Sequence, residues 1–411
     1  MQNKRLPLAL CLVIVFALHA IVSGAQNGVR ILENRHGAVF AEKITFGLIA
    51  EGDEAIEGVT LYYRRQNEAV TNRVVPEFTP GRHVEARYEK TLERGEIPPG
   101  TVMEYYWRLD LASGTRSETE TVTFVYEDDR FAWQALEAGR VTILYYGDDS
   151  TAALGKELAE RGKSTLARLQ SEVGVTLEAP VRVYVYGDAD DMVAALAPRS
   201  QGFDERILTL GVAVSDDTLL LLGDHPAVRQ TLAHELSHVV VGLATENPYA
   251  PLPRWLDEGL AMYTEGELPV DNAVALKRAV TRDALISVRS LSGYTGDASQ
   301  VDLYYGEVHS LVGFLLRTYG RDKMGELLQV FKQGTYQEDA VQQVYGLSLD
   351  ELDARWRQSL GLGPRATPAP ADEPAPQTRR GQPSRQPCPS LSLIAGLGLA
   401  AALGARRVRL C

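Results

Sequence analysis

The sequence predicts an α+β protein in which an all-β domain precedes a mixed domain of strands and helices. Residues 26–128 contain short runs rich in β-branched and aromatic residues, separated by turn clusters such as Pro98-Pro99-Gly100. From residue 129 onward, strands alternate with helices and then give way to helices alone, which is an α+β pattern. The 411 residues suffice for two domains with additional terminal segments.

The N-terminal domain has the strand spacing of an immunoglobulin- or fibronectin-like sandwich. Several short strands with turn signals between them are typical of two antiparallel sheets packed face to face. A turn is expected at Glu51-Gly52-Asp53, after the first strand. The domain shows no catalytic constellation, and we interpret it as an accessory domain. Its expected strands cover residues 39–50, 58–65, 83–92, 101–112 and 118–126.

The mixed domain extends over residues 129–362, and its helices carry the residues of interest. Strands are expected at 141–146, 181–186, 207–214 and 218–222. A helix is expected to begin near Pro226, a favoured residue in a first helical turn. The other expected helices cover residues 151–173, 188–196, 253–265, 271–281, 303–319, 322–332 and 349–360.

Both chain ends predict export. Residues 1–25 combine Lys4 and Arg5 with an apolar run and small residues, which is typical of a cleaved secretory signal. An uncleaved membrane anchor is the alternative. Residues 363–390 form a proline-rich linker, and residues 391–411 form an apolar stretch that ends in arginines, as in prokaryotic C-terminal sorting tails. We therefore expect a protein at the cell surface or outside the cell, with the C-terminal tail as its membrane anchor.

Composition excludes several classes of function. The net charge of −12 disfavours a nucleic-acid partner, because phosphate binding requires a basic face. The three cysteines, Cys11, Cys388 and Cys411, all lie in the terminal segments. The globular part therefore has no disulfide, cysteine nucleophile or cysteine-ligated metal.

The pattern that carries chemistry is an H-E-x-x-H motif formed by His234, Glu235 and His238 on an expected helix. Residues i and i+4 of a helix lie one turn apart on one face, so both imidazoles can reach the same ion. Glu235 can then face a water molecule on that ion. Zinc hydrolases use three protein ligands and keep one position for water, so the motif alone is incomplete.

A second segment, from Trp255 to Ala261, offers the missing ligand. It reads W-L-D-E-G-L-A and places Glu258 on the next helix. Together the two motifs resemble those of gluzincin metallopeptidases, in particular the peptidase MA-like group, and the second motif is also similar to that of aminopeptidase N-type enzymes. The resemblance implies a zincin-like fold and one zinc ion per chain, bound by His234, His238 and Glu258.

Other residues near Glu258 have expected roles. Gly259 has no side chain and would let the second helix approach the motif helix closely. Asp257 can accept a hydrogen bond from a ligand histidine. The alternative for Asp257 is an exposed acid at a helix start.

The resemblance implies that the protein hydrolyses peptide bonds in a peptide or protein substrate. Glu235 would act as the general base, taking a proton from the water on zinc and passing it to the leaving nitrogen. Tyr305 would stabilise the oxyanion, and Tyr304 and His309 are alternatives for that role. By analogy with such folds, the strand at 207–214 is the edge strand that pairs with an extended substrate.

Two departures from the aminopeptidase N-type pattern bear on the reaction. Nineteen residues separate His238 from Glu258, one more than in those enzymes. The G-x-M-E-N segment, which helps to fix the substrate's amino terminus there, is missing, so endopeptidase or limited trimming activity is expected, with an endopeptidase preferred. The rival interpretations are a catalytically silent protein- or peptide-binding module on the same scaffold and a structural surface protein braced by its metal.

Overall fold

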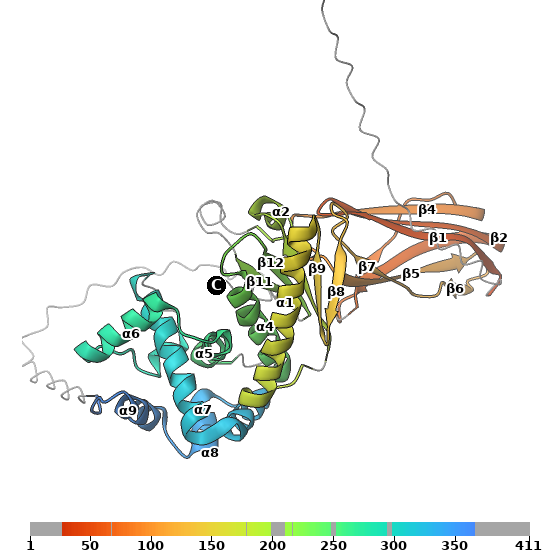
Figure 1. The fold of residues 1–411 in the computed structure, drawn as a ribbon. Coiled ribbons are helices and arrows are strands. Elements are labelled where there is room, and N and C mark those ends of the chain that lie inside the picture. Colours follow the sequence, from red (N-terminus) through yellow and green to blue (C-terminus); the bar gives the residue numbers. More distant parts are fainter. Residues whose placement is uncertain are drawn as a thin grey trace, which may run out of the picture.

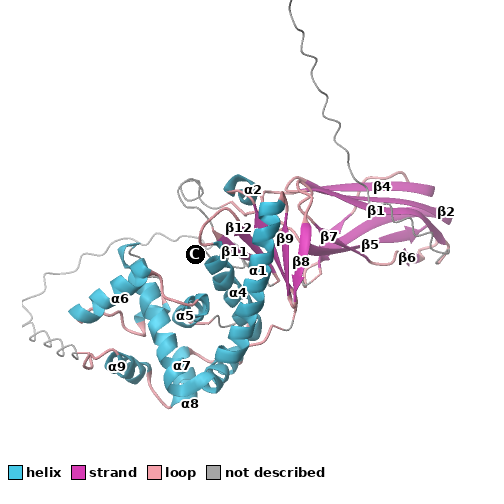
Figure 2. Cartoon of the chain, in the orientation of Figure 1, coloured by secondary structure: helices cyan, strands magenta, loops and turns pink. Residues whose placement is uncertain are grey.

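The computed structural model describes residues 27–66, 68–177, 179–198, 210–215, 217–247, 252–293 and 298–365. In these ranges the chain forms two sheets, and helices gather around one of them (Figures 1 and 2). The expected signal segment and the C-terminal tail lie outside the described residues. Among the helices of the described part, none has the length and apolar character needed to cross a membrane.

The first sheet holds seven antiparallel strands, all from the N-terminal region. Its centre is β2, which pairs with β1 and β4 through its first half and with β3 and β5 through its second half. The strands thus form one hydrogen-bonded network, and the immunoglobulin- or fibronectin-like sandwich stays a prediction. The strands are β1 (Val29–Val39), β2 (Lys43–Arg65), β3 (Asn72–Val74), β4 (Gly81–Thr91), β5 (Thr101–Leu111), β6 (Arg116–Glu118) and β7 (Val122–Tyr126).

The expected turn at Glu51-Gly52-Asp53 is wrong, because β2 continues through it. The pairing is irregular between Glu51 and Ile56, where β2 leaves β4 and turns to β5. A Cβ atom on Gly52 would lie 2.5 Å from the Glu54 carbonyl oxygen, so the irregular stretch requires glycine. Gly52 and its acidic neighbours therefore mark an irregularity within β2, at the point where this strand stops pairing with β4 and begins to pair with β5.

The second sheet has five strands in the order β11-β12-β10-β9-β8. The central strand β10 runs parallel to β9 and β12, and the two edge strands run antiparallel to their neighbours. The sheet is therefore mixed, and β11 includes the described part of the edge strand expected at 207–214. The strands are β8 (Gln134–Ala138), β9 (Val141–Tyr145), β10 (Val181–Tyr186), β11 (Gly211–Ser215) and β12 (Thr218–Leu222).

The two faces of this second sheet bury different partners, because side chains alternate along each strand. Val181, Val183 and Val185 join the core beneath the helices. Tyr184 and Tyr186 point the other way and join the core of the N-terminal strands. The second sheet is therefore a middle layer, with helices on one face and the N-terminal strands against the other (Figure 1).

The buried side chain of Asp128 holds the junction between the two sheets, where it is inaccessible to solvent. It accepts a hydrogen bond from the Tyr186 hydroxyl at 3.0 Å. It also accepts two from the Arg130 guanidinium, at 2.8 and 2.6 Å. The Trp133 indole donates to the Asp128 carbonyl oxygen at 2.8 Å. The chain thus enters the second sheet in a fixed orientation.

The helices follow the expected order, with additions. The long helix α7 contains Gly320 at φ 84°, a non-helical residue that separates the two helices expected at 303–319 and 322–332. Helix α1 continues into a π-helical turn, Leu169–Val173, and 3-10 turns occur at Ser290–Ser292 and Ala298–Gln300. The α-helices are α1 (Asp149–Arg168), α2 (Ala189–Val193), α4 (Val228–Ala244), α5 (Arg254–Glu265), α6 (Val270–Arg282), α7 (Val301–Lys332), α8 (Gln337–Tyr345) and α9 (Leu349–Ser359).

Replacing Asp128 by alanine should lower the free energy of unfolding by about 1–3 kcal/mol, because Arg130 and Tyr186 lose a buried acceptor. Urea unfolding followed by tryptophan fluorescence measures this effect. An Asp190→Ala variant, changed at an exposed residue of α2, is the control. Equal unfolding midpoints for the two variants would show that the junction contacts contribute nothing to stability.

Candidate metal centre

The H-E-x-x-H motif lies in the middle of α4, a helix covered on most sides. Its apolar residues Leu232, Leu236 and Val239 join the core between the second sheet and the neighbouring helices. His234 and His238 are 5% and 7% exposed. Water therefore has little access to either imidazole, and polar partners must come from the protein or from a bound ion.

The residues expected as metal ligands converge on one point. The Nε2 atoms of His234 and His238 lie 3.2 Å apart. Glu258, which is 5% exposed, comes from α5. Its Oε2 atom lies 3.6 Å from Nε2 of His234 and 3.7 Å from Nε2 of His238. Two helices thus present three ligand atoms as a compact triangle.

The dimensions of this triangle fit a zinc ion. Bonds of about 2.0–2.2 Å at tetrahedral angles put neighbouring ligand atoms about 3.3–3.6 Å apart. Oε2 of Glu258 and Oε1 of Glu235 are buried and have no hydrogen-bond partner. Such oxygens are costly to bury unless a cation or another ligand meets them. Within the described residues, His234, His238 and Glu258 form the group of histidines and acids whose ligand atoms lie close enough together to hold a metal ion.

The electrostatics of Glu258 also favour a charged ligand. Burial alone would raise the pKa of its carboxyl group. The close approach of the two motif histidines more than offsets burial, and the pKa of Glu258 falls below its ordinary value. Glu258 is therefore ionised at neutral pH, as a metal ligand must be.

Each histidine is oriented by a carboxylate on α5. Nδ1 of His238 lies 2.9 Å from Oδ1 of Asp257, the contact expected from the sequence. Nδ1 of His234 lies 2.5 Å from Oε1 of Glu265. Because a carboxylate accepts hydrogen bonds, each Nδ1 carries the proton and each Nε2 offers its lone pair to an ion.

Glu265 is the site residue that the sequence analysis missed. It lies seven residues after Glu258, about two helical turns away on the same face of α5. That spacing is the signal that could have identified it. Neither motif includes it, and its contact depends on how α4 and α5 pack together.

Gly259 allows close packing, but with a different helix from the one expected. A Cβ atom on Gly259 would lie 2.5 Å from Cγ2 of Val312 and 2.7 Å from the carbonyl oxygen of Val308. Both belong to α7, so Gly259 brings α7 rather than α4 against α5. The first turns of α7 therefore lie beside Glu258.

The three candidates for oxyanion stabilisation differ in their contacts. Tyr305 lies one turn before Val308, is partly buried, and packs edge-on against Tyr304 with 5.6 Å between ring centroids. The Tyr304 hydroxyl donates to the Leu291 carbonyl oxygen at 3.2 Å, which occupies its proton. His309 packs against Tyr263, near the end of α5, with 6.1 Å between ring centroids. These contacts do not decide between the three residues, and the role of Tyr305 stays a prediction.

The edge strand β11 lies directly beside the general-base candidate. A Cβ atom on Gly211 would lie 3.0 Å from Cγ of Glu235 and 2.5 Å from Cγ2 of Thr231. Glycine at this position therefore lets the strand touch α4. Val212, Ala213 and Val214 follow it, so this strand carries no acid next to the motif.

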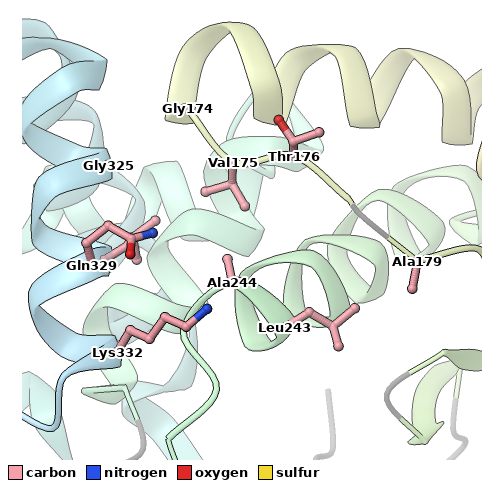
Figure 3. Close-up of a pocket in the computed structure, with 10 residues that line it drawn as sticks. Gly174, Val175, Thr176, Ala179, Leu243, Ala244, Gly325, Gln329 and Lys332 are labelled. Atoms are coloured by element: carbon pink, nitrogen blue, oxygen red, sulfur yellow. The ribbon is translucent and has the colours of Figure 1, made fainter.

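A separate pocket of about 460 Å³ lies at the C-terminal end of α4 (Figure 3). Leu243 and Ala244 of α4 form one side, and Gln329 and Lys332 of α7 form another. The residues of the metal-binding triangle do not line it. The pocket is therefore not part of the candidate metal centre.

A comparison with models of protein families gives a match to the part of the chain that contains the candidate metal centre. Residues 161–361 match the family model described as the Peptidase MA superfamily. This segment, just under half of the chain, is therefore similar to the peptidase MA superfamily. The matched segment contains α4, α5 and α7, and hence all the candidate site residues. This similarity and the triangle of ligand atoms support a zinc metallopeptidase. A search of curated proteins gave no match.

Several solved structures are similar to the chain at low sequence identity. An M1 zinc metallopeptidase from Deinococcus radiodurans, bound to Tyr-Ser-Ala, is 13% identical, with 80% of this chain and 92% of that chain covered and a TM-score of 0.36. An aminopeptidase N family protein from Idiomarina loihiensis is 11% identical over 80% and 75%, with a TM-score of 0.36. Aminopeptidase A from Legionella pneumophila is 12% identical over 78% and 47%, with a TM-score of 0.33. The match therefore spans less than half of the Legionella chain.

Removing either orienting carboxylate should weaken zinc binding by about 10–100-fold, because the imidazole it holds becomes free to turn. Asp257→Ala and Glu265→Ala test this in a competition between the protein and a chromophoric chelator. Asp257→Asn is the matched control, since its amide oxygen can still accept from Nδ1 of His238. Zinc affinity equal to that of the native protein in both alanine variants would contradict the assignment.

Proposed function

We propose that this protein is a zinc-dependent endopeptidase in which His234, His238 and Glu258 hold the metal. The observation that carries the proposal is the triangle of two Nε2 atoms and one Oε2 atom, with edges of 3.2–3.7 Å. Glu235 lies next to His234 on the same helix, with a buried oxygen that has no hydrogen-bond partner. Metal-dependent peptide hydrolysis requires a set of metal ligands with such a carboxylate beside it.

Bound zinc lowers the pKa of water toward ~7 and polarises the carbonyl group of the scissile bond. Glu235 accepts one proton from the attacking water as its oxygen bonds to the carbonyl carbon. Tyr305 donates a hydrogen bond to the carbonyl oxygen as negative charge develops there. Glu235 then returns the proton to the leaving nitrogen as the carbon–nitrogen bond breaks, so the carboxylate is regenerated.

The apolar sequence of β11 favours an endopeptidase over an aminopeptidase. An enzyme that removes N-terminal residues needs an acid near the site to bind the substrate's ammonium group. On the face that meets α4, this strand offers Gly211 and Ala213 instead, because Val212 and Val214 face the core of the N-terminal strands. An internal, uncharged stretch of substrate backbone can add to such an edge strand through main-chain hydrogen bonds.

We further propose that the enzyme is exported and held at the membrane by residues 391–411. Support comes from the apolar run within residues 1–25 and from the linker, apolar stretch and arginines at the other end. The second candidate function is a catalytically silent module that binds proteins or peptides. The buried, unpartnered oxygen of Glu235 disfavours it, because binding alone does not need that group.

Replacing Glu235 by glutamine should leave zinc binding intact and lower kcat for peptide hydrolysis by about 10²–10⁴-fold, because the amide cannot accept the proton. Elemental analysis gives the zinc content, and mass spectrometry of a digested peptide library gives the activity. His238→Ala is the companion variant and should lose zinc. A Glu235→Gln protein that cleaves like the native protein would place the base elsewhere. A native protein that holds zinc but cleaves nothing favours the silent module.

Blocking the amino terminus of a peptide substrate should not reduce its cleavage. We expect a peptide and its N-acetylated form to be cut at the same internal bonds with similar kcat/KM. Liquid chromatography with mass spectrometry identifies the bonds cut. Cleavage confined to the first bond of the free peptide, and abolished by acetylation, would instead identify an aminopeptidase.

A further inference from the structure

The two oxygens of Glu258 have different partners. Oε2 faces the Nε2 atoms of the two motif histidines at 3.6 and 3.7 Å. Oε1 lies 3.2 Å from Nη2 of Arg254, one helical turn earlier on α5. One oxygen of the carboxylate therefore contacts the Arg254 guanidinium, and the other faces the metal position.

Arg254 is held in place by a second contact. Its guanidinium carbon lies 5.5 Å from the ring centroid of Tyr304, in the range of a cation–π interaction. Tyr304 is itself fixed, since it is 4% exposed and its hydroxyl donates to the Leu291 carbonyl oxygen. The side chain of Arg254 is 17% exposed. A stacked and largely buried guanidinium keeps its direction better than a mobile surface charge.

The number of oxygens that Glu258 gives to zinc matters for the reaction. A catalytic zinc site keeps one position for water beside three protein ligands. A carboxylate free to rotate can offer both oxygens and compete with water for that position. An arginine that binds one oxygen leaves a single oxygen for the metal.

We propose that Arg254 is a positioning residue that keeps Glu258 a monodentate ligand by holding Oε1. This inference rests on the proposed zinc site. In the native protein, Oε1 stays on the guanidinium and Oε2 alone faces the metal. When Arg254 loses its charge and its donors, Glu258 turns and both oxygens approach the metal.

The test uses the full-length protein loaded with cobalt(II) in place of zinc, because the visible absorption of cobalt falls when its coordination number rises from four to five. Arg254→Met keeps the apolar stem and removes the donors, and Arg254→Lys restores the charge with an ammonium group that can donate to Oε1. Arg168→Met is the matched control. Arg168 lies 5.0 Å from the Tyr263 ring centroid and 3.2 Å from Glu172, a carboxylate outside the metal-binding triangle.

We expect Arg254→Met to bind cobalt with a weaker, five-coordinate spectrum and to lose about 10–100-fold in kcat when loaded with zinc. Arg254→Lys should return the spectrum toward that of the native protein, and Arg168→Met should change neither quantity. A native-like spectrum in Arg254→Met, or an equal change in Arg168→Met, overturns the inference. A native protein that binds neither cobalt nor zinc overturns the zinc site itself, which separates the two failures.

Discussion

Acidic side chains buried beside two imidazoles constrain the helical half of this protein. Glu235, Asp257 and Glu258 are each at most 6% exposed, and all lie on two helices that pack together. Like charges at such short range repel strongly when water is excluded. Compensation comes from the Nδ1–H groups of the two histidines, from the charge of Arg254 and from the metal that the ligand geometry fits.

This constraint accounts for several features around the site. The carboxylates on α5 fix the histidines from their Nδ1 sides, so the Nε2 atoms face inward. Gly259 lets α7 close over α5, and α7 brings its tyrosines to the same region. The edge strand β11 reaches Glu235 through Gly211. A glycine thus lies at each of these two close approaches, Gly259 for α7 and Gly211 for β11.

Local geometry explains which parts of the site were accessible from the sequence. His234 and His238 are one turn apart on a single helix, so their proximity follows from helix geometry alone. Glu258 required a second motif and its resemblance to a family. Glu265 and Arg254 lie two turns after and one turn before Glu258, but their partners depend on the packing of α4, α5 and α7, which no short motif encodes. The strands show the same limit, since β1, β3 and β8 were missed and the irregularity at Gly52 was read as a turn.

The middle position of the second sheet has a consequence for how the protein withstands cleavage of its chain. Tyr184, Tyr186, Leu220 and Leu222 complete the core of the N-terminal strands although they belong to the second sheet. Burying a large apolar side chain contributes about 1.5–3 kcal/mol, so separating the two regions exposes these four at a cost of about 6–12 kcal/mol. A proteolytic nick near residue 128 would therefore leave both pieces bound together, and the two regions would keep their arrangement after the cut.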